Sequence, residues 1–108
     1  MKILFDQGTP EPLREFLVGH VVETAYERGW STLSNGELLV AAEMSSFDVL
    51  VTTDQNLRQQ QDLANRQLAV LVLPTTRWPQ IRRHAGEVID AVATIQRGDY
   101  RELKWSAR

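Results

Sequence analysis

The chain has 108 residues, of which 43% are hydrophobic and 24% charged, with a formal net charge of −2. This composition predicts one globular domain over residues 1–108, long enough to bury a core without covalent or metal staples. No apolar run approaches the ~20 residues that a membrane-spanning helix needs. The absence of cysteine excludes a disulfide framework and a thiolate metal site. We therefore expect a cytoplasmic protein without a global basic surface for nucleic acid.

The first part of the chain alternates between a strand pattern and a helix pattern. Residues 2–6 predict a first strand that ends in Asp6. The turn after it favours a helix over residues 9–18, with Thr9 as the N-cap and a proline at the first helical position. A second short strand is expected over residues 20–24. Asp6 has two open interpretations, as a site residue or as the stabiliser of the turn that follows it.

A second helix is expected from Ser34 to about Ser46. Its start, Ser34-x-x-Glu37, has the spacing of a capping box, in which each side chain accepts a hydrogen bond from the other residue's backbone N–H. An acid in the first turn of a helix also suits the helix dipole. Glu37 is therefore either a structural cap or an acid available to a site, and both interpretations stay open.

A buried strand that is followed by an acid is the main indication of a functional site. Val49, Leu50 and Val51 form an apolar, β-branched run that is typical of a strand covered on both faces. Asp54 follows where this strand leaves the sheet, and ligands of open parallel sheets gather outside the carboxyl ends of the strands. Asp54 also has a structural alternative, as the N-cap of a short polar helix or extended turn over residues 54–65.

The last part of the chain predicts a strand, a long helix and an edge strand. Residues 68–73 are the most apolar run and predict a central or near-central strand, which ends at Pro74. One long helix is expected to begin at Trp78 and to end before Gly98, because its apolar residues recur at spacings of four and three. Residues 100–105 alternate in character and carry charges, as expected of an edge strand.

Strands that alternate with helices over this length predict a parallel α/β sheet with helices on both faces. That geometry brings Asp6, Glu37 and Asp54 toward one edge of the sheet. Three neighbouring carboxylates repel one another, so at least one should have a raised pKa unless a cation is bound. Mg²⁺ prefers oxygen ligands and lowers the pKa of a bound water, which suits the hydrolysis of a phosphodiester.

Three blocks of sequence carry a resemblance to a known family. They are the opening KILFDQGTP, the middle YERGWSTLSNGELLVAAE, and VLVTTDQNLRQQQDL followed by an apolar strand. With these blocks the chain resembles the PIN-like domain family, in particular small bacterial proteins related to VapC-type toxin ribonucleases. The resemblance implies a three-layer α/β/α sandwich with a mainly parallel sheet of about five strands. It also implies metal-dependent hydrolysis of RNA and a place in a toxin–antitoxin pair.

The resemblance also assigns roles to particular residues. It implies that Asp6, Glu37 and Asp54 are catalytic and hold Mg²⁺ or Mn²⁺. RNA and a cognate antitoxin are the partners it implies, and the three tryptophans are candidates for the surface of a homodimer. The supporting residues that we expect near the site are Asn35, Gln55, Asn56 and Arg58. The arginines that are candidates for holding phosphates are Arg58, Arg77, Arg82 and Arg83.

Two amides depart from the pattern of PIN nucleases. Asn35 stands where an Asp is common at the start of a helix, and Asn56 lies near a position where an acid is usual. An amide oxygen ligates Mg²⁺ but brings no charge. The alternative function is therefore a catalytically weak or inactive PIN-like module for binding or regulation. A phosphoacceptor receiver domain is a third hypothesis, but Gln7 stands where its second acid would follow the first strand.

Overall fold

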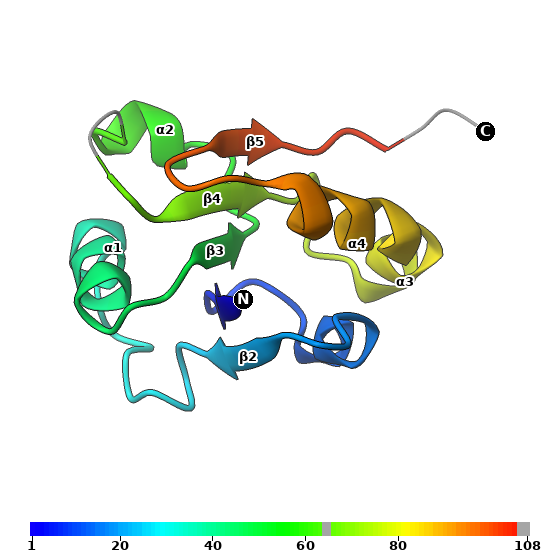
Figure 1. Ribbon diagram of the computed structural model, residues 1–108, viewed down its shortest axis with the longest axis horizontal. Coiled ribbons are helices and arrows are strands. Elements are labelled where there is room, and N and C mark those ends of the chain that lie inside the picture. The colour runs from blue at the N-terminus through cyan, green and yellow to red at the C-terminus, as the bar shows by residue number, and fades with distance from the viewer. Residues whose placement is uncertain (64–65, 106–108) are drawn as a thin grey trace.

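Five strands form one sheet in which every neighbouring pair is parallel, in the order β2-β1-β3-β4-β5 (Figure 1). The structure is a computed structural model that describes residues 1–63 and 66–105. The strands are β1 (Lys2–Phe5), β2 (Val21–Thr24), β3 (Val49–Thr52), β4 (Ala69–Val72) and β5 (Tyr100–Glu102). The predicted α/β class with a parallel sheet of about five strands is confirmed.

Helices cover both faces of this sheet. They are the 3₁₀ helix η1 (Glu11–Phe16) and the α-helices α1 (Asn35–Met44), α2 (Leu57–Gln60), α3 (Trp78–Arg83) and α4 (Ala85–Thr94). Figure 1 shows α1 and α2 on one side of the sheet and α3 and α4 on the other, and η1 packs beside α3 and α4. In the described residues, no helix combines the length and the apolar character needed to cross a membrane.

The core explains why the strands are continuous apolar runs. Along β3, Val49 and Val51 pack with the residues of η1, α3 and α4, whereas Leu50 packs with those of α1 and α2. All four residues of β3 and of β4 are buried. A strand covered on both faces has no solvent side and therefore shows no alternation of polar and apolar residues. The central position belongs to β3, and the prediction that residues 68–73 are near-central is confirmed.

The segment after β1 differs from the prediction. We expected an α-helix with Thr9 as its N-cap, but the helix is a 3₁₀ helix whose N-cap is Pro10, and no side chain caps it. The Thr9 side chain is buried and donates instead to Asp6 Oδ1 at 2.7 Å and to the Val51 carbonyl at 2.9 Å. The Thr9 hydroxyl therefore forms its hydrogen bonds at the ends of β1 and β3 and not at the start of η1.

The predicted long helix from Trp78 is in fact two helices that meet at His84. The backbone N–H of His84 donates to the carbonyls of both Gln80 and Ile81, and its φ of −110° lies outside the helical range. Its ring stacks on Trp105 with centroids 4.6 Å apart. The break thus coincides with a contact to the chain beyond β5, which the apolar spacing alone did not indicate.

Two further elements are shorter than expected. A short polar helix or extended turn was predicted over residues 54–65; the helix there is α2, and residues 64–65 lie outside the described residues. The predicted edge strand is confirmed as β5, the last strand of the sheet, but it ends at Glu102.

Candidate active site at the carboxyl edge of the sheet

Asp6 lies directly after β1, where two buried hydroxyl groups hold its carboxylate. Thr9 donates to Oδ1 at 2.7 Å, and Thr52 donates to Oδ2 through a short hydrogen bond. Burial raises the pKa of Asp6 above its ordinary value of 3.8, and the hydrogen bonds from Thr52 and Thr9 oppose this rise only in part. The structure therefore holds a partly buried acid in one orientation at the carboxyl edge, which is typical of a functional site.

Asp54 lies beyond the end of β3, and its carboxylate joins the starts of two helices. Its Oδ2 accepts a hydrogen bond from Asn35 Nδ2 at 2.6 Å, at the first residue of α1. Its Oδ1 accepts from the Asn56 backbone N–H at 2.9 Å, just before α2. The proposed N-cap role is thus wrong in detail, because the N-cap of α2 is Asn56 and Asp54 forms an Asx turn three residues before the helix begins at Leu57.

The Thr52 side chain connects the two acids. Phe5 lies opposite Val51 in the parallel ladder, so Asp6 and Thr52 follow at the same level. The Thr52 hydroxyl donates to Asp6 and accepts from the Asp54 backbone N–H at 3.0 Å. The expectation that Asp6 and Asp54 follow neighbouring strands at one edge is confirmed. Sequence reasoning missed Thr52, although a polar residue at the end of an otherwise apolar strand was a usable signal.

Glu37 forms the capping box that its spacing predicted. Its Oε1 accepts from the Ser34 backbone N–H at 2.9 Å, and Ser34 Oγ accepts from the Glu37 N–H at 3.2 Å. Glu37 is exposed, and its hydrogen bonds with Ser34 lower its pKa from 4.5. The structural interpretation of Glu37 is therefore confirmed. A role for Glu37 in metal binding or catalysis stays a prediction.

The expected supporting residues surround Asp54. Asn35 contacts Asp54 as described, and its Nδ2 lies 3.4 Å from Gln60 Oε1. Gln55 Nε2 donates to the carbonyls of Thr53 and Leu73 and so ties the loop after β3 to the end of β4. The side chains of Asn35 and Gln55 thus fix the loop that carries Asp54.

The loop after β1 lies close to the Thr53 side chain at Gly8. A Cβ atom on Gly8 would lie 2.5 Å from Thr53 Oγ1, a distance that real contacts do not reach. Beside this loop is an open hollow of about 460 Å³, which gives access to the side of Asp6. The hollow is lined mainly by polar side chains, which include Asp6, Gln7, Thr9, Glu11, Tyr26 and Glu27.

A tyrosine and an acid on β5 extend the same edge. Glu102 lies opposite Val72, which lies opposite Thr52, so the three strand ends are level. Tyr100 donates its hydroxyl to Glu102 Oε2 at 2.7 Å. Burial, followed by this hydrogen bond, raises the pKa of Tyr100 to about 12. Sequence reasoning missed this pair because its place depends on the register of β5.

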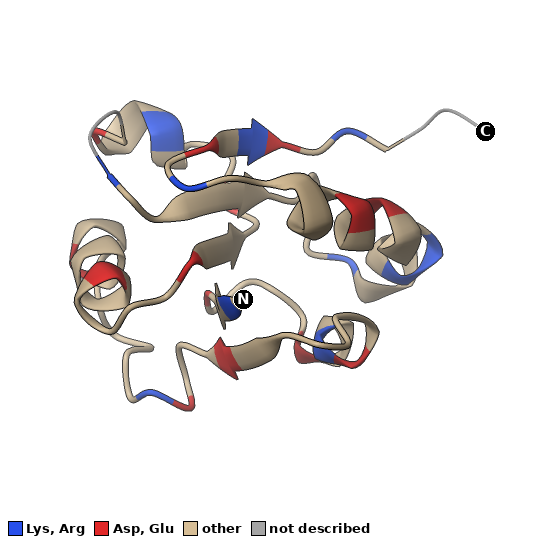
Figure 2. Cartoon of the chain, viewed as in Figure 1, with Lys and Arg blue, Asp and Glu red and all other residues tan. Residues whose placement is uncertain are grey.

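The charged residues do not form one dominant surface. Figure 2 shows basic segments on α2, β5 and α3, with acidic segments interspersed among them. Of the arginines that we considered for phosphate contacts, Arg58 is on α2, whereas Arg77, Arg82 and Arg83 are at or in α3. Arg58 is the one that follows Asp54 within the same loop and helix.

The residues at this edge that could hold a divalent cation are two carboxylates, those of Asp6 and Asp54. In residues 1–63 and 66–105, no group of three His, Cys, Asp or Glu side chains is placed to hold a metal ion. Two carboxylates, Asp6 and Asp54, do share the edge through Thr52. Mg²⁺ keeps several waters and is commonly held by one or two carboxylates together with substrate phosphates. The chemistry of these two acids is suited to that mode rather than to a closed cage.

Comparisons of the chain with protein-family models, with curated proteins and with solved structures gave no match.

Proposed function

We propose that the chain is a PIN-like domain, a three-layer α/β/α sandwich, that hydrolyses phosphodiester bonds of RNA with one Mg²⁺ or Mn²⁺ ion. The observation that carries the proposal is the Thr52 hydroxyl, which donates to Asp6 and accepts from the Asp54 N–H. Two acids on neighbouring parallel strands are thereby held at the edge where α/β proteins bind ligands. An open hollow lies beside Asp6, between the loop after β1 and the end of β2.

In this proposal Asp6 and Asp54 would hold the ion. When bound, such an ion lowers the pKa of a bound water and offsets the charge that develops on a phosphate. Thr9 and Thr52 orient the Asp6 carboxylate, and Asn35 orients that of Asp54. Because both threonine side chains are buried, the orientation of Asp6 is set by the fold before substrate arrives. The substrate is RNA, and the physiological setting is a cytoplasmic toxin with a cognate antitoxin.

A second function, as a binding or regulatory module without catalysis, is favoured by one contact. The Asn35 amide donates to Asp54 Oδ2 at 2.6 Å, which occupies an oxygen that a metal would use. A carboxylate at position 35 would instead add negative charge for the cation. In this alternative the same edge would contact RNA or a protein partner without cleaving it.

Cleavage of a labelled single-stranded RNA in Mn²⁺ tests the proposal. We expect wild-type protein to cleave it, and Asp6→Asn and Asp54→Asn each to lower the rate by orders of magnitude while the fold survives. Asp48→Asn is the matched control, since Asp48 lies before β3 at the opposite end of the strand and accepts from the Lys2 N–H at 2.8 Å. It should cleave at the wild-type rate.

The outcomes separate the two functions. A wild-type protein that binds RNA but cleaves neither RNA nor DNA in Mg²⁺ or Mn²⁺ supports the binding module. Activity that survives in Asp54→Asn rules out the proposed site.

A further inference from the structure

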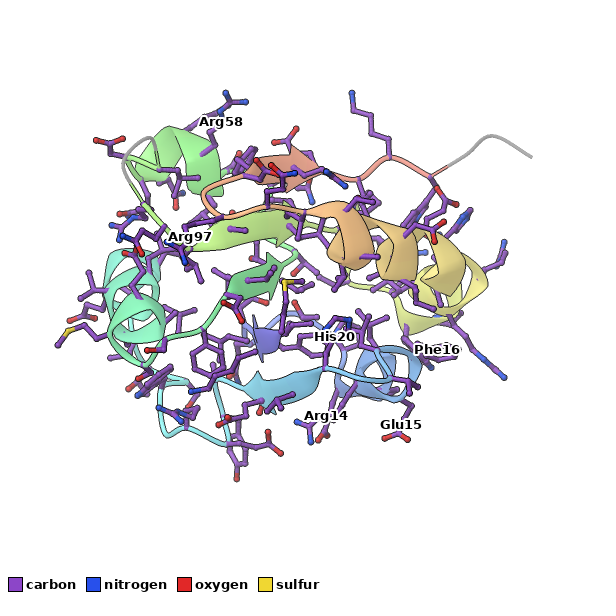
Figure 3. The ribbon with its side chains drawn as sticks, viewed as in Figure 1. Arg14, Glu15, Phe16, His20, Arg58 and Arg97 are labelled. Carbon is purple, nitrogen blue, oxygen red and sulfur yellow. The ribbon has the colours of Figure 1, made fainter. Side chains whose placement is uncertain are left out.

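Arg58 lies over an aromatic ring and has no carboxylate partner in the part of the chain that the structure describes. Its guanidinium carbon lies 5.0 Å from the centroid of the Tyr100 ring. Within the described residues no ion pair or side-chain hydrogen bond to Arg58 occurs, and the residue is exposed. Figure 3 shows the side chain extending outward from α2. The Tyr100 ring thus supports the guanidinium plane of Arg58, and the N–H groups of that guanidinium have no side-chain acceptor among the described residues.

Tyr100 provides a firm base for that guanidinium. Its ring is partly buried against the cluster that contains Leu57 of α2 and Val70 of β4. Its hydroxyl is anchored on Glu102 at 2.7 Å, and a pKa of about 12 keeps the phenol protonated as the donor. The ring is therefore fixed both by packing and by a hydrogen bond, while Arg58 lies over it.

This pair is next to the proposed catalytic edge. Arg58 is four residues after Asp54 in the sequence, and the charge of Asp54 is close enough to raise the pKa of Tyr100. Glu102 and Asp54 thus both add negative charge around the Tyr100 ring that Arg58 covers. That balance disfavours a phosphate at this point but is compatible with a neutral base, which stacks on an arginine plane as readily as on an aromatic ring.

We propose that Arg58, positioned by Tyr100, is a stacking platform for one base of a single-stranded RNA that enters the site at Asp54. The identity of the ligand as RNA rests on the proposed function. The platform reads no sequence, because every base has a π-face. It places the strand so that a phosphate beside the stacked nucleotide lies toward Asp54. Arg58 is here a binding residue and Tyr100 a positioning residue.

Binding without metal tests this platform separately from hydrolysis. In EDTA, fluorescence anisotropy would compare a short labelled single-stranded RNA with an abasic ribose-phosphate strand of the same length. Arg58→Lys keeps the charge but removes the plane, and Tyr100→Leu removes the ring. Both should weaken binding of the RNA roughly five-fold to a hundred-fold, the range for one stacked base, and leave binding of the abasic strand unchanged.

Two further variants serve as controls. Tyr100→Phe keeps the ring but removes the hydrogen bond to Glu102, so it should weaken binding of the RNA less than Tyr100→Leu does. Arg97→Lys makes the same exchange as Arg58→Lys at an exposed position between α4 and β5 and should have no effect. Circular dichroism establishes that each variant is folded, and Arg58→Lys alone decides the outcome if Tyr100→Leu does not fold.

The inference is overturned if Arg58→Lys binds RNA like the wild type, if it weakens both strands equally, or if wild-type protein does not distinguish the RNA from the abasic strand. Base-dependent binding in EDTA by a protein that cleaves nothing in Mn²⁺ supports the platform and removes the proposed hydrolysis. The opposite result is cleavage that needs Asp6 and Asp54 but not Arg58, by a protein that shows no base-dependent binding. That result supports the proposed hydrolysis and removes the platform.

Discussion

The Thr52→Val substitution removes the hydroxyl that links the two acids while nearly conserving side-chain volume. Thr52 is 1% exposed, and its hydroxyl forms one hydrogen bond to a carboxylate and one to a backbone N–H. Hydrogen bonds to charged groups contribute about 1.5–3 kcal/mol and neutral ones about 0.5–1.5 kcal/mol. Because Asp6 and Asp54 are both partly accessible to water, we expect the lower part of the sum, about 2 kcal/mol. In a domain of this size that loss lowers Tm by roughly 10 °C.

The loss should depend on pH in a definite direction. The hydrogen bond from Thr52 lowers the pKa of Asp6, so its removal raises that pKa further. A carboxyl whose pKa is raised by folding adds stability below its ordinary value of 3.8, and this contribution is lost as pH rises through the folded-state pKa. Thr52→Val should therefore be more destabilised at neutral pH than below pH 3.8, where Asp6 is mostly protonated in both the folded and the unfolded protein.

Thermal and urea unfolding in EDTA, at neutral and acidic pH, measure this effect. Thr52→Ser is the matched control, since it keeps the hydroxyl and loses one methyl group, which costs on the order of 1 kcal/mol at any pH. The reasoning is refuted if Thr52→Val is as stable as the wild type at neutral pH. It is also refuted if Thr52→Val and Thr52→Ser lose equal stability at neutral pH and again at acidic pH.

Three further substitutions test the individual groups. Asp6→Asn should keep or raise Tm in EDTA at neutral pH, because it removes the buried charge. The gain should vanish as pH falls toward 3.8, and Mn²⁺ should no longer stabilise the variant. Asn35→Asp places a carboxylate against Asp54 and should lower Tm in EDTA, tighten Mn²⁺ binding in calorimetry and speed cleavage, whereas unchanged Mn²⁺ affinity would count against Asp54 as a ligand. Glu37→Ala should lower Tm above pH 4.5, with the loss fading as pH falls through the lowered pKa of Glu37; Glu37→Gln keeps the capping box, so slower cleavage by a variant of wild-type Tm would reveal a role beyond capping.

The strands were predictable because burial on both faces leaves a direct trace in the sequence. Val49 to Val51 are apolar without alternation, and the parallel arrangement then places Asp6 and Asp54 at one edge. The capping box at Glu37 was predictable because it depends on residues within one turn. Neither the strands nor the capping box depends on the order of the strands or on their register.

The features that sequence reasoning missed depend on contacts between distant segments. Thr9 leaves its expected capping role because β3 offers it the Val51 carbonyl, 42 residues away in sequence. The break at His84 accompanies a stack on Trp105. Thr52 and Tyr100 acquire their places only when the register of the sheet is known. Local propensity does not contain this information.

A crystal of the protein soaked in Mn²⁺, with anomalous scattering recorded at the manganese edge, tests most directly whether Asp6 and Asp54 form a metal site. The account predicts one manganese peak in contact with both carboxylates, and no peak there in Asp54→Asn. A well-ordered crystal with no peak at this edge, or with manganese only on other acids, would contradict it.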